Sequence, residues 1–281
     1  MEDFYINITS QYKSYHHSNI TSHYDHDEPK NDDSNKKVYF IMHVAICIII
    51  SIGLPLIFVA IHALYSLVRN DHVVPIYAIN LHVSDIIKFC CMIGEMAEPE
   101  DWKTPNIFSY IHIHCLNTSV YFMACVALER YLVIACPLWY RCRRSIKTSV
   151  VVCVVVWVLP LVFLLIVFFL DNTDRVLEIS SSVLLLLPFP LFIFFLGGTL
   201  KALSPSRVPS DEKRRIVRTL VLVLLTYTLL FLPTIIGFLS KGARDNDNFS
   251  NLFVMFDKLS PLADLVLYVF MRKGTIDQNG Q

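Results

Sequence analysis

The sequence is short of charge. Only 17% of its 281 residues are charged, and 24 basic side chains balance 24 acidic ones. A formal net charge of zero provides no field that would favour nucleic acid or an acidic partner. By contrast, 54% of the residues are hydrophobic and the mean hydropathy is +0.52. This composition is too apolar for an ordinary soluble domain and indicates a membrane protein.

Motifs of catalysis are also missing. The sequence contains no His-Glu-x-x-His pair, no phosphate-binding glycine loop, and no nucleophile and base at a motif spacing. The histidines near the start of the chain match no strong metal-binding template; they are His16, His17, His23 and His26. We therefore expect neither an enzyme nor a bound cofactor or metal.

Long apolar segments dominate the chain. A helix needs about 20 apolar residues to cross the hydrocarbon of a bilayer. Such runs predict helices over residues 38–68, 75–97, 106–137, 146–170, 179–203, 213–240 and 250–271. The seventh is the least apolar, because it contains Asp257, Lys258 and Asp264. The predicted fold is an all-α membrane protein, a seven-transmembrane helix bundle, with six helices and a re-entrant end as the alternative.

The distribution of basic residues predicts the orientation. With the N-terminus outside, 14 of the 24 Lys and Arg fall on the inner side, in loops, helix ends and tail; of the other ten, four fall in the N-terminal tail, four in the outer loops and two within helices. Residues 1–37 then form a polar extracellular tail without a cleavable leader, residues 38–273 the membrane domain, and residues 274–281 a short cytosolic tail. We expect a multi-pass protein of the plasma membrane.

Glycosylation sequons agree with this orientation. Three of them, at Asn7, Asn19 and Asn248, fall outside in the predicted topology. The eight cysteines lie in predicted helices or on the inner side, so no extracellular disulfide framework is predicted.

A Glu-Arg-Tyr sequence at the inner end of the third predicted helix gives the clearest resemblance to a known family. Glu129, Arg130 and Tyr131 are followed by Pro137-Leu138, and this arrangement resembles the rhodopsin-like (class A) G-protein-coupled receptors. An arginine at that depth is costly unless it is paired or reaches the interface. The resemblance implies that Arg130 restrains the inactive state and later contacts a heterotrimeric G protein.

Other helices carry further parts of the resemblance. Asn80 to Asp85 is similar to the family's helix-two motif, and Trp157 to its central tryptophan. Phe231-Leu232-Pro233 stands where the family has Cys-Trp-x-Pro, and Asp264 to Tyr268 where it has Asn-Pro-x-x-Tyr. The activation switch implied by the resemblance therefore comprises Glu129, Arg130, Tyr131, Phe231, Pro233 and Tyr268. Pro233 is expected to kink its helix.

The chain departs from the family at its outer disulfide. The family's cysteine at the top of helix three would fall near Pro105, and residues 171–178 contain no cysteine either. The segment 201–225 and Asp264 are similar to the branch that contains nucleotide, lipid, protease-activated and proton-sensing receptors, and a proton-sensing-like receptor is our expectation within it.

An intramembrane polar site is implied by the family register, which would bring Asp85, Ser119 and Asp264 together as in its sodium pocket. Two carboxylates in a dry cavity repel each other, and this favours a bound cation or a shared proton. A static hydrogen-bonded polar knot is the alternative.

His112 is the candidate for ligand binding or pH sensing. It precedes Arg130 by 18 residues, which is five turns of an α-helix, so both residues face the same side. An imidazole titrates near physiological pH, and acidic residues, among them Glu95, cluster near the adjacent outer loop. A merely structural histidine is the alternative.

The predicted function is that of a receptor. A proton, lipid or nucleotide-like extracellular ligand would act on a heterotrimeric G protein through movement of the sixth helix. The basic run Lys213-Arg214-Arg215 predicts contact with anionic membrane lipids, the G protein, or both. The alternatives are a receptor-derived membrane protein that activates no G protein, and a proton or cation transporter.

Overall fold

In a computed structural model of the protein, the residues described are 30–69, 76–97, 107–136, 146–170, 174–203, 210–239 and 247–276. Within these ranges the structure is helical apart from Cys136 and a turn at Leu187, and it has no strand. The helices are α2 (Lys30–Arg69), α3 (Ile76–Ala97), α4 (Ile107–Ala135), α6 (Ile146–Leu170), α7 (Asp174–Leu186), α8 (Pro188–Leu203), α9 (Ser210–Thr226), the π-helix η1 (Tyr227–Phe231), α10 (Leu232–Leu239) and α12 (Asp247–Ile276).

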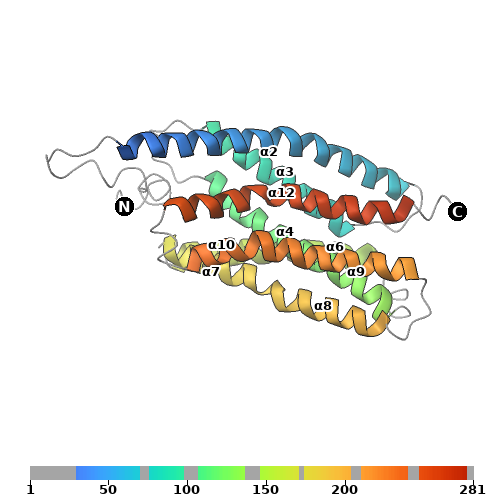
Figure 1. Ribbon diagram of the computed structural model, residues 1–281. Helices are drawn as coiled ribbons and strands as arrows, with labels where there is room; N and C mark the ends of the chain where they lie inside the picture. The colour runs from blue at the N-terminus through green and yellow to red at the C-terminus, as the bar shows by residue number, and fades with distance from the viewer. Residues whose placement is uncertain are drawn as a thin grey trace.

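The helices pack side by side as one elongated bundle (Figure 1). Helices α7 and α8 follow one another as one rod, and α9, η1 and α10 form a second, so the described residues make seven rods. Six of these contain a stretch long and apolar enough to cross a membrane. The predicted fold class, an all-α membrane protein, is confirmed.

Helix α12 carries charged residues in its middle, at Asp257, Lys258 and Asp264. Its 30 residues form one continuous helix, which at 1.5 Å per residue extends about 45 Å, enough to cross a bilayer. It packs against α2, α3, α9 and α10. A re-entrant end, the alternative considered from the sequence, is therefore not what the structure has.

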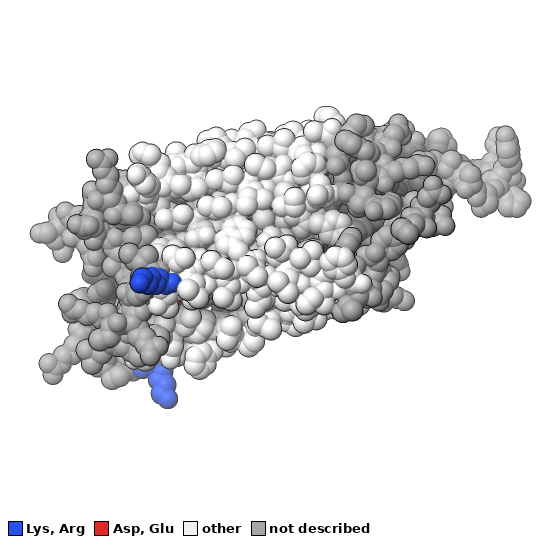
Figure 2. Space-filling view, turned by 180° about the vertical axis from the view of Figure 1, so that it is seen from behind, with Lys and Arg blue, Asp and Glu red and all other residues white. Residues whose placement is uncertain are grey.

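Helix α4 forms the centre of the bundle, since it packs against α3, α6, α7, α8 and α9. Val120, Phe122 and Met123 in its middle are completely buried. In contrast, α2 and α6 present long apolar side chains outward, such as Phe58 and Val151. Figure 2 shows the described part of one face as a surface without charge, apart from basic side chains at one end. Such a surface suits contact with lipid tails.

The rod predicted over residues 179–203 is interrupted at Leu187, between α7 and α8. Pro188 has no N–H, so it cannot bond to the carbonyl of Leu184 four residues earlier. The hydroxyl of Tyr121 on α4 donates to that carbonyl at 3.2 Å, and the hydroxyl of Tyr227 donates to the next one, of Leu185. Two tyrosines from neighbouring helices thus satisfy the broken end.

A second irregularity lies in the rod predicted over residues 213–240. Its five-residue π-helix, η1, ends at Phe231, two residues before Pro233. Pro233 cannot donate to the carbonyl of Leu229, and a π-bulge is one of the local adjustments by which a helix accommodates such a loss. The expected distortion at Pro233 therefore takes the form of a π-segment.

Candidate functional site

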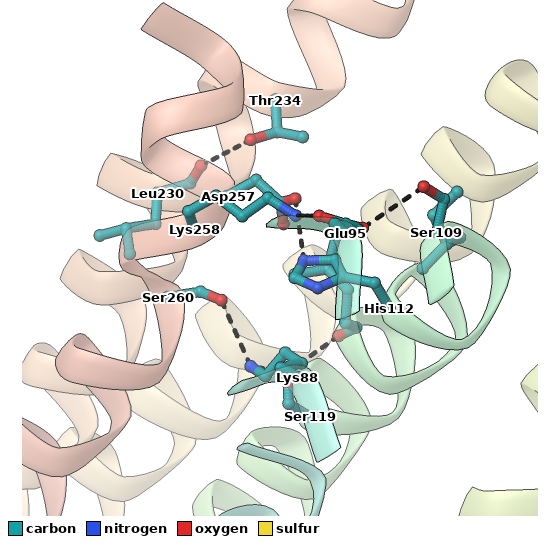
Figure 3. Close-up of polar contacts among 12 residues, drawn as sticks. Lys88, Glu95, Ser109, His112, Ser119, Leu230, Thr234, Asp257, Lys258 and Ser260 are labelled. Atoms are coloured by element: carbon teal, nitrogen blue, oxygen red, sulfur yellow. Dashed lines mark hydrogen bonds and ion pairs between the residues drawn. The ribbon is translucent and has the colours of Figure 1, made fainter. Parts of the chain in front are cut away.

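Lys88 lies at the centre of a buried polar cluster (Figure 3). Its Nζ atom is 2.8 Å from Asp85 Oδ1 and 3.6 Å from Asp264 Oδ2. The same ammonium donates to Ser119 Oγ and Ser260 Oγ, both at 3.3 Å. None of these five residues exposes any surface. We call them the inner cluster.

Helical spacing explains why these side chains meet. Asp85 and Lys88 are three residues apart on α3, and Ser260 and Asp264 are four apart on α12, so each pair occupies one face of its helix. Ser119 approaches from α4. The inner cluster therefore connects three helices through one ammonium group.

The charges of the inner cluster do not balance by themselves. Asp85 and Asp264 supply two negative charges and Lys88 supplies one positive charge. His82 contributes a ring nitrogen, Nδ1, 3.3 Å from Asp85 Oδ2, and it carries a charge only when it is protonated. Buried charges are expensive unless they are paired, and one ammonium does not balance two carboxylates.

The structure brings together the predicted polar site, Asp85, Ser119 and Asp264, and places a cation among them. That cation is the side chain of Lys88, which was not among the predicted site residues. A usable signal was present, because a lysine three residues after an intramembrane aspartate on one helix face can reach it. The three-residue spacing of Asp85 and Lys88 therefore indicates an ion pair.

A second set of ion pairs lies further along the same three helices, and we call it the outer cluster. Glu95 Oε2 on α3 is 2.6 Å from Lys258 Nζ on α12, and Ser109 on α4 donates to Glu95 Oε1 at 3.3 Å. His112 Nε2 on α4 is 3.0 Å from Asp257 Oδ2. These pairs are largely buried, since the side chains of His112 and Lys258 are only 3% and 6% exposed.

The outer cluster contains both predicted ligand or pH-sensing residues. The two ion pairs of the outer cluster do not join His112 directly to Glu95. Their partners, Asp257 and Lys258, are adjacent residues on α12 (Figure 3). Pro261 follows them and removes the N–H that would bond to the Asp257 carbonyl. In the sequence, Asp257 and Lys258 indicated only that the seventh predicted helix is the least apolar.

The Glu-Arg-Tyr residues occupy the last turns of α4. Glu129 and Arg130 are half-buried, and the buried Nε of Arg130 makes no hydrogen bond among the described residues. The ring of Tyr131 stacks on Phe195 of α8 with centroids 5.7 Å apart. It also covers Gly198, where an added Cβ would lie 2.6 Å from the ring. Tyr131 thus joins α4 to α8.

Phe231 belongs to an aromatic stack in the bundle interior. Its ring stacks on that of Tyr227 with centroids 5.7 Å apart, and Phe189 also stacks on Tyr227 at 5.6 Å. Pro233 is half-buried in α10. The side chains of Tyr268 and Asn248, and all of Asn7 and Asn19, lie outside the described residues.

The remaining motif residues form a contact between α3 and α6. Trp157 Nε1 donates to Asn80 Oδ1 at 3.1 Å, and Asn80 Nδ2 donates to the Ile76 carbonyl at 2.9 Å. Phe122 packs edge-on against the indole. This arrangement pairs two residues that the resemblance named separately.

The chemistry available in these clusters is that of paired charges rather than of metal binding. Across the described ranges, no three His, Cys, Asp or Glu side chains lie together in a way that could hold a metal ion. Each cluster joins α3, α4 and α12 through charged and hydroxyl groups. This arrangement suits a conformational switch.

Comparison with known proteins identifies relatives that are receptors by name. A family model described as "7 transmembrane receptor (rhodopsin family)" matches residues 57–178. The mouse Mas-related G-protein coupled receptor member A8 is 29% identical over 222 residues, which cover 73% of this chain and 70% of that protein. Member A6 of the same mouse group is 35% identical over 106 residues, covering 35% and 34%. Mouse free fatty acid receptor 3 is 29% identical over 129 residues, covering 43% and 40%.

Proposed function

Because the chain belongs to the rhodopsin-like family of seven-transmembrane receptors, we propose that it transmits an extracellular stimulus to heterotrimeric G proteins. In this proposal the N-terminus and its sequons are outside the cell, and the protein resides in the plasma membrane. The observation that carries the proposal is the burial of two charged clusters across α3, α4 and α12. Apolar residues often replace buried ion pairs without loss of stability, so their presence supports a switching role.

The proposed output is a movement of the rod formed by α9, η1 and α10 relative to α4 and α12. The π-segment and Pro233 give this rod a point where its hydrogen-bond ladder is already interrupted. Arg130, half-buried at the end of α4, is the residue that would contact the G protein once the rod moves. Exposed Arg214 and Arg218 at the start of α9 would contact the G protein or anionic lipid.

The proposed stimulus acts on the outer cluster. His112 carries a positive charge only when it is protonated, so the strength of its pairing with Asp257 depends on protonation. This supports a proton as the stimulus. A lipid with a carboxylate, the class named by the free fatty acid receptor among the relatives, would instead compete with Glu95 for Lys258. A nucleotide-like ligand would compete in the same way through its phosphates.

Nucleotide exchange on G proteins tests the proposal. Membranes containing the protein would be given G protein and exposed to steps between about pH 5.5 and 8, to fatty acids, and to nucleotides. We expect one of these stimuli to accelerate exchange, and Arg130→Ala to abolish the acceleration while the protein still reaches the membrane. Ion flux without any exchange would show that the receptor function is wrong and would favour a transporter.

Replacing a single histidine distinguishes a proton stimulus from the other proposed stimuli. If protons act through the outer cluster, His112→Phe removes the pH response, whereas His114→Phe preserves it. His114 is a matched control because it lies on the same helix but packs against Trp157 instead of an acidic side chain. An unchanged pH response in His112→Phe would reject the role proposed for His112.

A further inference from the structure

The inner cluster has the side chains of a cation site, but an ammonium of the protein fills it. We infer that Lys88 acts as a built-in cation that closes this site to free metal ions, and that replacing Lys88 creates a site for Na⁺. The inference concerns the purified chain and does not depend on its coupling to a G protein.

The first observation in favour of this inference is the geometry around the Lys88 ammonium group. Lysine has three N–H donors, and Nζ donates to Ser119 and Ser260 and forms an ion pair with Asp85 Oδ1 at 2.8 Å. Asp264 lies at 3.6 Å and adds a charge without a close hydrogen bond. A free cation would need the same oxygen atoms and would be repelled by the ammonium. Lys88 and a metal ion therefore exclude each other.

The second observation is the set of oxygen atoms around the ammonium group. Two carboxylates and two hydroxyls meet around one point, and all four groups offer the oxygen ligands that hard cations take. Asp264 is completely buried, and neither of its carboxylate oxygens has a hydrogen-bond partner among the described residues. Lys88 therefore leaves both oxygen atoms of Asp264 without a hydrogen bond.

The third observation is the charge that remains when Lys88 is replaced. Lys88→Met keeps a long unbranched side chain but leaves Asp85 and Asp264 facing each other without a positive charge between them. Repulsion between two buried carboxylates is relieved by a bound cation or by a proton. At neutral pH and high sodium, the oxygen-lined space left by the ammonium then favours Na⁺.

Thermal unfolding in sodium chloride against choline chloride, at equal ionic strength, tests the inference on purified full-length protein. We expect the same midpoint in both salts for the natural chain. For Lys88→Met we expect a midpoint that rises with sodium concentration and saturates, as for any ligand that binds only the folded state. The double variant Lys88→Met with Asp85→Asn should lose this rise, because one of its two carboxylates is gone.

Two results would overturn the inference. One is a saturable stabilisation of the natural chain by sodium over choline, which would show that Lys88 does not exclude the ion. The other is a folded Lys88 variant without any sodium response. Lys88→Gln, which keeps polar contacts to the serines, provides this second measurement if Lys88→Met yields too little folded protein. Neither result bears on nucleotide exchange, so the proposed receptor function is tested separately.

Discussion

Neutralising each aspartate of the inner cluster in turn should have unequal effects on stability. Asp85→Asn and Asp264→Asn remove the same charge, so both leave Lys88 facing one remaining carboxylate. In Asp264→Asn that carboxylate is 2.8 Å from the ammonium, whereas in Asp85→Asn it is 3.6 Å away. We expect Asp264→Asn to be the more stable of the two variants.

The size of the difference follows from these distances. With an effective dielectric constant of about 20, the attraction is about 5.9 kcal/mol at the shorter distance and about 4.6 kcal/mol at the longer one. Asp85→Asn also alters the 3.3 Å contact between Asp85 Oδ2 and His82 Nδ1, and a hydrogen bond there is worth about 1 kcal/mol. The free energy of unfolding should therefore differ by about 2 kcal/mol between the variants, which corresponds to roughly 5 °C in the midpoint.

A dye that reacts with cysteines as they become exposed can measure this difference during heating. Cys91, Cys115 and Cys153 are buried in the folded protein, so their reaction reports unfolding of the bundle. Both variants should be compared with the natural chain at neutral pH. Equal midpoints for the two variants, or a lower midpoint for Asp264→Asn, would refute the assignment of Asp85 as the main partner of Lys88.

Two further predictions concern contacts of α4. Gly198→Ala places a Cβ 2.6 Å from the Tyr131 ring, so it should displace that ring and reduce stimulated nucleotide exchange. Gly197→Ala is the control, because nothing lies within 4 Å of its new Cβ, and it should leave nucleotide exchange unchanged. Equal exchange in both variants would contradict the role of the contact between Tyr131 and Gly198. Tyr121→Phe leaves the Leu184 carbonyl without its donor and should lower the free energy of unfolding by about 1 to 2 kcal/mol; an unchanged unfolding midpoint would show that this carbonyl is satisfied in another way.

The positions of the helices could be predicted from the sequence because the bilayer sets the length of an apolar run. The uncharged run from Val150 to Leu170 lies within α6, and the charged seventh segment lies within α12. The interruptions were harder to place. Pro188 and Pro190 were visible in the sequence, but whether prolines bend a membrane helix or divide it depends on whether neighbouring groups, here Tyr121, can satisfy the freed carbonyls.

The contents of the site could be predicted only in part. Asp85, Ser119 and Asp264 were expected together from the register of the family, and the structure places all three around one ammonium. Local sequence patterns do not specify how α3 is rotated relative to α12, so the pairing of Glu95 with Lys258, 163 residues apart, could not be derived. Lys88 was overlooked because a buried lysine is costly, and its compensation comes from three different helices.

In the proposed mechanism, the rod of α9, η1 and α10 moves relative to α4 when the protein activates a G protein. Spin labels on non-canonical amino acids at Val133 and Val221, both exposed, would report the distance between α4 and α9 without disturbing the eight cysteines. Nucleotide-free G protein should lengthen this distance in the natural chain but not in Arg130→Ala. An unchanged distance in the natural chain, with G protein bound, would contradict the account.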